Sequence, residues 1–233
     1  MHLGKLAVTL PLPFLGTREN VELAVRCEKE WGYDAIWLAE TNGADSFSLA
    51  GAIAQATDRV EIGTAIVPVY NRTPAVLAMS AATLADLSGG RFVLGLGTSS
   101  HAMIEGWHGV PFEQPLAHVH DAVSILRSAL AGEKTRYEGK ALESHGFRLG
   151  VRLPEPPKIF LAALREKMLN LAGALGEGLI INMMPLDSMP KILGAYRQGA
   201  VDVERDASGD DVVARFQIAV TDDKDAARNM VRM

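Results

Sequence analysis

The sequence is poor in cysteine, because Cys27 is the only one among 233 residues. An internal disulfide needs two cysteines, so a disulfide-stapled scaffold is excluded, and a single thiol fits a reducing compartment. Cys27 lies four residues from both Leu23 and Trp31, a spacing that places all three on one apolar helix face. We therefore expect a buried structural thiol rather than a reactive one.

Positive charge is not in excess either. The chain holds 23 Lys and Arg against 28 Asp and Glu, a formal net charge of −5. General nucleic-acid binders need clustered Lys and Arg to displace counterions from phosphates. We expect small-molecule partners and no nucleic acid.

Long hydrophobic runs are also missing. No stretch approaches the roughly 18 apolar residues that a membrane span requires. Residues 1–15 are apolar, but Pro11 and Pro13 interrupt them and Lys5 lies inside them. No small-x-small cleavage site follows, so these residues do not match a secretory leader. The sequence therefore predicts a cytoplasmic protein without a membrane anchor.

The chain does contain a regular alternation of short β-branched apolar runs and longer runs of helical period. Strands joined by crossover helices are parallel and bury both faces. The predicted strands cover residues 5–12, 35–38, 61–67, 92–96, 159–162, 179–182 and 212–220.

This rhythm fits a closed barrel or an open doubly wound sheet. An open sheet would ordinarily carry a glycine-rich turn after its first strand, whereas this chain has Pro11-Leu12-Pro13-Phe14 there, so we favour a TIM-type (β/α)8 barrel. Only seven strands are counted, so the eighth βα unit is missing, through truncation or in a naturally shortened relative with an open seam. Residues 1–233 then form one domain, with residues 134–149 as a surface hairpin.

Ligands of such folds bind at the carboxyl ends of the strands. There the chain offers hydroxyls and small residues but neither a catalytic triad nor facing metal ligands, so a cofactor must bring the reactivity. Ile66, Val67 and Pro68 can form an apolar shelf for a planar redox ring. The helix start that follows Ala162-Ala163-Leu164-Arg165 suits an anionic tail, because its N–H groups and a cation lie together. Close approach is also easy at Gly97-Thr98-Ser99.

Two carboxylates are candidates for acid-base or substrate contacts. Glu40 follows the second strand, and Glu105 belongs to the long loop after the fourth. Glu40 can equally be a salt-bridged residue, and Glu105 can equally sit in a solvated loop. Four histidines fall between residues 101 and 120, but His118 and His120 would point apart on a helix, so no metal site is expected.

The helix predicted for residues 74–87 is apolar almost all round. An outer helix of a barrel should keep a polar face, so we expect this one to pack against a second subunit in a homodimer. The alternative is burial beneath the missing C-terminal segment.

Several motifs resemble those of the luciferase-like monooxygenase superfamily, in particular its oxidoreductases that depend on the deazaflavin coenzyme F420. The most specific is Ser88-Gly89-Gly90-Arg91-Phe92, inside a longer match over residues 84–97. The others cover residues 32–40, 72–74, 105–112 and 162–168.

The resemblance implies a barrel, often dimeric, that binds the deazaflavin at the strand carboxyl ends and its phosphate after the fifth strand. It also implies a non-proline cis peptide near Ala65-Ile66-Val67, under the ring. Where some relatives have a glutamate after the fourth strand this chain has Ser99-Ser100, so no proton donor is assigned there. The expected activity is hydride transfer between coenzyme F420 and a small organic substrate; an FMN-dependent monooxygenase and a catalytically silent flavin-binding protein are the alternatives.

Overall fold

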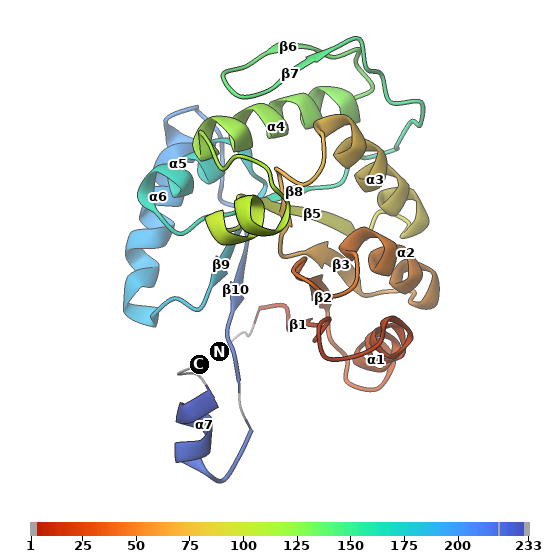
Figure 1. Cartoon of the computed structure of the whole chain (residues 1–233), viewed down its shortest axis with the longest axis vertical. Coiled ribbons are helices and arrows are strands. Elements are labelled where there is room, and N and C mark those ends of the chain that lie inside the picture. The colour runs from red at the N-terminus through yellow and green to blue at the C-terminus, as the bar shows by residue number, and fades with distance from the viewer. Residues whose placement is uncertain (1–3, 219, 231–233) are drawn as a thin grey trace.

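A computed structural model describes residues 4–218 and 220–230 of the chain. Figure 1 shows a curled sheet with helices along its outer side, a small hairpin at one end and helix α7 projecting from the body. The main sheet contains β1 (Ala7–Thr9), β2 (Ala35–Leu38), β3 (Glu61–Thr64), β4 (Val67–Pro68), β5 (Phe92–Gly97), β8 (Ile159–Ala162), β9 (Gly178–Asn182) and β10 (Asp211–Arg215). The helices are α1 (Thr17–Lys29), α2 (Ser46–Ala56), α3 (Pro74–Leu87), α4 (Pro115–Leu130), α5 (Glu166–Leu175), α6 (Met189–Val201) and α7 (Lys224–Met230), with shorter helical turns η1 (Ala102–Trp107) and η2 (Leu186–Ser188).

The strands follow the order β1-β2-β3-β5-β8-β9-β10, with β4 paired to β5, and every pair in this sheet is parallel. Each step along the sheet is also a step along the chain, as in a (β/α) barrel. The predicted fold class is confirmed. All strand carboxyl ends therefore meet at one rim.

Local hydrogen bonds and a proline fix the starts of helices α3 and α1. Thr73 caps α3 by accepting a bond from the Val76 N–H, and Pro74 takes the first helical position, where its missing N–H costs nothing. Gly16 is the residue before the first turn of α1. Glu19 Oε2 accepts the Gly16 N–H at 2.7 Å and so fixes that helix start.

The strand predicted for residues 61–67 is broken in two. β3 ends at Thr64, β4 begins at Val67, and the Ala65-Ile66 peptide between them is cis, which confirms the expectation from the family resemblance. The Thr64 hydroxyl donates to the Gly95 carbonyl (2.8 Å) and accepts from the Gly95 N–H (2.9 Å). A Cβ at Gly95 would lie 1.7 Å from the Thr64 carbonyl oxygen, so only glycine permits this approach of β5 to the break.

The barrel has a seam between its first and last strands. In the described part of the chain β1 pairs only with β2 and β10 pairs only with β9. Lys5 Nζ lies 3.3 Å from both Glu61 Oε2 and Asp211 Oδ2, so it links the amino-terminal ends of β3 and β10. The eighth βα unit of a full barrel is not seen among these residues.

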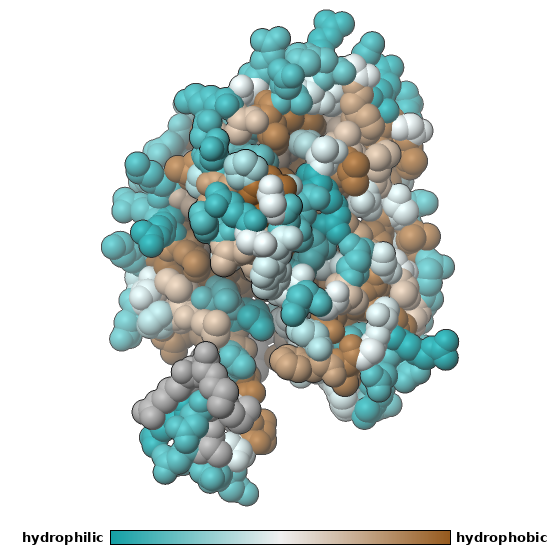
Figure 2. All heavy atoms as spheres, viewed as in Figure 1, coloured by the Kyte–Doolittle hydropathy of each residue, from teal (hydrophilic) through white to brown (hydrophobic). Residues whose placement is uncertain are grey.

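The prediction of a strand over residues 212–220 is wrong beyond Arg215, where β10 ends. The apolar alternation continues through Phe216 and Ile218, but these side chains are 49% and 81% exposed, and no neighbouring strand pairs with them among the residues that the structure describes. Residue 219 lies outside the described residues. Figure 2 shows apolar side chains on this segment between the body and α7.

The surface hairpin consists of antiparallel β6 (Arg136–Glu138) and β7 (Glu143–His145). Asp121 of α4 anchors it, because its buried carboxylate accepts bonds from the Ala141 N–H (2.7 Å), the Leu142 N–H (3.1 Å) and the Tyr137 hydroxyl (2.8 Å).

Among the described residues, no helix is both long and apolar enough to cross a membrane.

Candidate active site at the strand carboxyl ends

A cavity of about 530 Å³ opens at the rim where the strand carboxyl ends meet. Its walls come from β1, β2, the β3-β4 break, β5, β8, β9 and β10, together with the loop before α4 and the start of α5. The lining residues are Thr9, Trp37, Ala65, Ile66, Gly97, Thr98, Ser99, Phe112, Pro115, Ala162, Ala163, Leu164, Arg165, Met168, Ile180, Asn182, Val213 and Arg215. A concave, mostly apolar site with a few polar groups is typical of a small-molecule site.

The inner wall is apolar. Trp37 is buried and stacks on Phe160, with ring centroids 5.9 Å apart. Gly97 allows the end of β5 to lie close to the β3-β4 break and to β8, because a Cβ there would lie 3.2 Å from Ile66 Cγ1 and from Ala162 Cβ. A larger residue at position 97 would therefore displace two residues of the cavity wall.

Donors for an anion line another part of the cavity. Arg165 is the residue before α5, and no side chain caps the start of this helix, so the first N–H groups of the helix remain available for a ligand beside the Arg165 cation. Asn182 and Arg215 end β9 and β10, and Arg215 Nη1 donates to Asn182 Oδ1 at 3.0 Å. The cavity thus joins an apolar shelf to a cationic rim.

Two residues beside the cavity have left-handed backbone conformations that are uncommon outside glycine. Ser99 follows β5 with φ 61°, and Met183 follows β9 with φ 50°. Such residues cost roughly 1–3 kcal/mol and gather where a ligand has to be approached closely. Ser99 Oγ lies 3.2 Å from Met103 Sδ, a contact to the loop above the cavity.

The structure brings the predicted cofactor-binding residues together from three separate segments. Ala65 and Ile66 line the cavity, as do Gly97-Thr98-Ser99 and Ala162-Ala163-Leu164-Arg165. Val67 does not line it. The Val67 side chain is fully buried in the core, because it begins β4 and faces away from the cavity beside Ile66.

Glu40 is held in an ion pair rather than pointing free into the cavity. Arg72 donates to both Glu40 oxygens (2.6 and 3.0 Å) and also bonds Asp45, and the Glu40 side chain is 11% exposed. Burial alone would lower the pKa of Arg72, but the hydrogen bonds and charges of Glu40 and Asp45 outweigh it and raise that pKa. The Glu40 N–H donates to the Ile66 carbonyl, so this ion pair adjoins the cis peptide.

Glu105 fastens the loop above the cavity. Its Oε1 accepts the Phe112 N–H at 2.9 Å, and its Oε2 lies 2.9 Å from His101 Nε2. Phe112 lines the cavity, whereas Glu105 does not. The acid-base roles suggested for Glu40 and Glu105 stay predictions, and the structure adds a positioning alternative for each.

Sequence reasoning missed several lining residues. Asn182 ends a predicted strand and so belongs to the predicted ligand-binding rim, but it has no assigned role, and Arg215 falls inside the longer strand predicted for residues 212–220. A predicted strand that ended at Arg215 would have placed this residue at the carboxyl end, where ligands bind. In the structure half-buried and exposed residues alternate along β10, and Val213 and Arg215 share its half-buried face. Phe112 and Met168 come from loop and helix positions that no strand pattern predicts.

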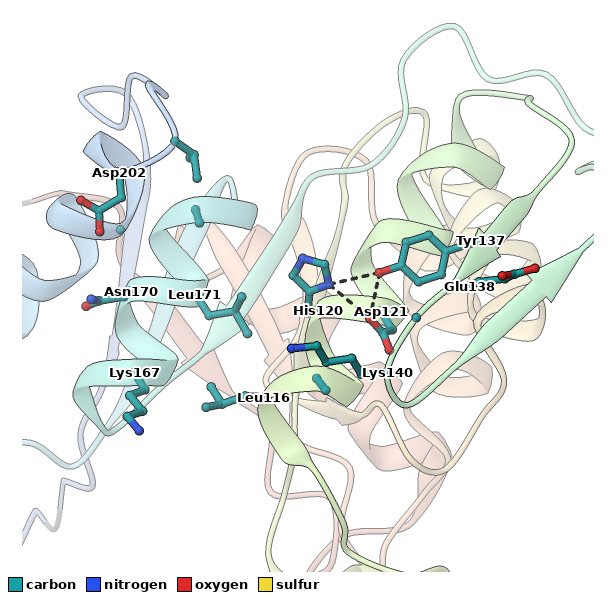
Figure 3. Close-up of a pocket in the computed structure, with 15 residues that line it drawn as sticks. Leu116, His120, Asp121, Tyr137, Glu138, Lys140, Lys167, Asn170, Leu171 and Asp202 are labelled. Atoms are coloured by element: carbon teal, nitrogen blue, oxygen red, sulfur yellow. Dashed lines mark hydrogen bonds and ion pairs between the residues drawn. The ribbon is translucent and has the colours of Figure 1, made fainter.

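A second cavity, of about 780 Å³, lies outside the barrel between α4, the hairpin, α5 and the end of α6. Figure 3 shows His120, Asp121 and Tyr137 pointing toward one another there, and His120 Nδ1 lies 3.2 Å from Asp121 Oδ1. These bonds join the hairpin to α4. Because the cavity lies away from the strand carboxyl ends, we do not assign the chemistry to it.

The histidines are dispersed. His118 stacks on Tyr70 with ring centroids 3.9 Å apart, while His120 belongs to the hairpin anchor. Burial lowers the pKa of His118, although the charge of Asp121 opposes this. Among the described residues no group of three His, Cys, Asp or Glu side chains is arranged to hold a metal ion.

The family model for luciferase-like monooxygenases matches residues 7–233. The chain belongs to this family. Among luciferase-like relatives, 5,10-methylenetetrahydromethanopterin reductase of Methanolobus tindarius is 31% identical, over 95% of this chain and 68% of its own length. The F420-dependent glucose-6-phosphate dehydrogenase of Rhodococcus erythropolis is 30% identical, over 93% of this chain and 69% of its own length.

The luciferase-like fold is also recognisable in solved structures. The coenzyme F420 dependent tetrahydromethanopterin reductase of Methanopyrus kandleri superposes with a TM-score of 0.85 at 21% identity, covering 95% of this chain and 68% of that one. The chain spans about two thirds, 64–69%, of the length of the curated relatives that it matches. Relatives that are F420-dependent oxidoreductases support the predicted enzyme class and cofactor.

Proposed function

We propose that this protein is an oxidoreductase that transfers a hydride between coenzyme F420 and a small organic substrate. The observation that carries the proposal is the cavity itself, in which an apolar shelf and a cationic helix start converge at the strand carboxyl ends. Flavin-type carriers have a flat ring and an anionic tail, and both halves of the cavity match this chemistry.

The ring would lie on Ala65 and Ile66, beside Gly97. The phosphate-bearing tail would lie at Arg165 and the first N–H groups of α5. Coenzyme F420 supplies the hydride-carrying ring when it is bound. The chain itself would bind and orient the reactants and exclude water with the walls built from Trp37 and Phe112.

A titration of the purified protein with coenzyme F420 tests the proposal. We expect saturable binding, read from tryptophan fluorescence, and a rise in melting temperature that grows with ligand concentration. Gly97→Leu should abolish both, because its side chain would displace Ile66 and Ala162 of the cavity wall; circular dichroism checks that the unliganded variant is folded. Gly209→Leu, in a loop where an added Cβ meets nothing within 4 Å, is the matched control.

FMN is the second candidate cofactor, because the shelf and the cationic helix start suit any flavin. If FMN raises the melting temperature and coenzyme F420 does not, the cofactor assignment is wrong, and oxygen consumption with reduced FMN would identify a monooxygenase. Tight binding without turnover across a panel of reductants and acceptors would favour a silent flavin-binding protein.

We further propose that the protein is a cytoplasmic homodimer without nucleic-acid or membrane partners. The support for a dimer is α3, on which Leu77, Ala78 and Ala81 are buried inside while Val76 and Met79 are 40% and 46% exposed. Exposed large apolar residues on an outer helix suit a subunit interface.

A further inference from the structure

Arg215 points into the barrel at the carboxyl end of its last strand. Along β10, Asp211, Val213 and Arg215 are half buried while Val212 and Ala214 are exposed. Val213 and Arg215 both line the cavity. A cation on this face of the strand therefore lies at the mouth of the cavity.

The charges on this face of β10 are balanced at one end only. Asp211, at the amino-terminal end, is paired with Lys5. Arg215, at the other end, has no carboxylate partner among the described residues, and its side chain donates only to the amide oxygen of Asn182. None of the residues that line the cavity is an Asp or a Glu. A half-buried guanidinium without a counter-charge is typical of a site that takes its anion from a ligand.

The side-chain amide of Asn182 adds a second, neutral hydrogen-bond donor beside Arg215. Its Oδ1 accepts the bond from Arg215 at 3.0 Å, which leaves its amide N–H groups for another acceptor. A guanidinium and an amide on neighbouring strand ends form a donor pair that suits the oxygens of a carboxylate or a phosphate. Arg165 belongs to a different element, the start of α5, so cationic residues from two separate elements line the cavity.

We propose that Arg215 and Asn182 form the anion subsite for the substrate, which is therefore a small carboxylate or phosphate ester. This inference rests on the proposed function in one respect, because it leaves Arg165 to the tail of coenzyme F420. It goes beyond the proposed function by stating that the substrate is an anion and that its anionic group binds at the ends of β9 and β10.

The test measures anion binding by melting temperature at constant ionic strength, with coenzyme F420 present and absent. Inorganic phosphate and acetate are the two probes, and chloride is the reference. We expect one or both probes to stabilise the wild-type protein saturably. Arg215→Met should weaken that binding at least about tenfold, the usual effect of losing a charge-assisted hydrogen bond.

Two more variants sharpen the result. Asn182→Asp keeps the size of the side chain and places a carboxylate beside the guanidinium, so it should abolish anion binding by supplying the missing counter-charge. Arg152→Met removes an arginine from an exposed loop position that does not line the cavity and should leave anion binding unchanged. The relative strength of phosphate and acetate distinguishes a phosphate ester from a carboxylate.

The same variants expose a wrong assignment. The inference is overturned if neither probe binds, or if Arg215→Met binds both as the wild type does. It is also overturned if Arg215→Met weakens binding of coenzyme F420 tenfold but spares its tail-less chromophore, because Arg215 would then serve the cofactor. If the wild type ignores coenzyme F420, the proposed function fails, whereas the titration without cofactor still tests the anion subsite.

Discussion

At the scale of single residues, the ion pair of Glu40 and Arg72 links the end of β2 to the cavity wall. Their bidentate pair is largely buried and adjoins the Ile66 carbonyl through the Glu40 N–H. Removing one partner of a buried pair leaves an uncompensated charge and is strongly destabilising. The pair therefore acts as a support for the shelf, whether or not Glu40 also moves a proton.

Replacing Arg72 tests this support. We expect Arg72→Met to lower the free energy of unfolding by about 3 kcal/mol and to weaken coenzyme F420 binding, as measured by urea denaturation and fluorescence titration. Arg72→Lys, which keeps the charge without the two-pronged geometry, should lose less. Glu40→Gln that keeps its stability and cofactor affinity but loses hydride transfer would instead assign a catalytic role to Glu40.

The sequence could predict which strand ends meet but not which side chains pair there. Ala65, Gly97 and Ala162 were found because parallel strands bring their carboxyl ends to one rim. The partner of Glu40 was not found, since Arg72 is 32 residues away and its position depends on the chain after the β3-β4 break. The same limit applies to Phe112, whose position is fixed by Glu105 across the loop.

At the scale of elements, the hairpin is attached to α4 through one buried carboxylate. Burial would raise the pKa of Asp121, but hydrogen bonds from Ala141, Tyr137 and Leu142 outweigh it and lower that pKa. A group whose native pKa is depressed stabilises the fold above its unfolded pKa and loses this contribution as pH falls through the native one. Asp121 thus contributes fully above about pH 4 and progressively less below it.

Asp121→Asn should therefore destabilise the protein by about 1–3 kcal/mol at pH 7, and its difference from the wild type should shrink as pH falls below about 4. Urea denaturation across this pH range measures both. Asp86→Asn, on an exposed position of α3, is the control and should show neither effect. A difference that stays constant down to pH 3 would contradict this account of the anchor.

Element types were predicted well where periodicity is long and less well where tertiary contacts decide. Helix α4 follows its apolar period, and α3 and α4 both begin at a proline. The break between β3 and β4 and the π-helical turn over residues 102–107 leave no periodic signal, because each depends on neighbours distant in sequence. The predicted strand over residues 212–220 is longer than β10, since alternation alone does not reveal where the neighbouring strand stops.

At the scale of the whole molecule, the proposed dimer depends on α3. Met79→Glu places a charge on its exposed apolar side and should convert a dimer to a monomer, as read by light scattering at micromolar protein. Lys29→Gln, at the end of α1, changes the net charge by the same amount and should leave the mass unchanged. A monomeric wild-type protein would refute the dimer.

The loop above the cavity has one consequence for any ligand that enters. Phe112 is fixed by the Glu105 carboxylate and packs on Tyr70, with ring centroids 5.3 Å apart. This wall is thus preorganised by the chain's own contacts. The conformational entropy of Phe112 is lost when the protein folds rather than when a ligand binds. The hydrogen bond from the Phe112 N–H to Glu105 therefore raises ligand affinity although it does not touch the ligand.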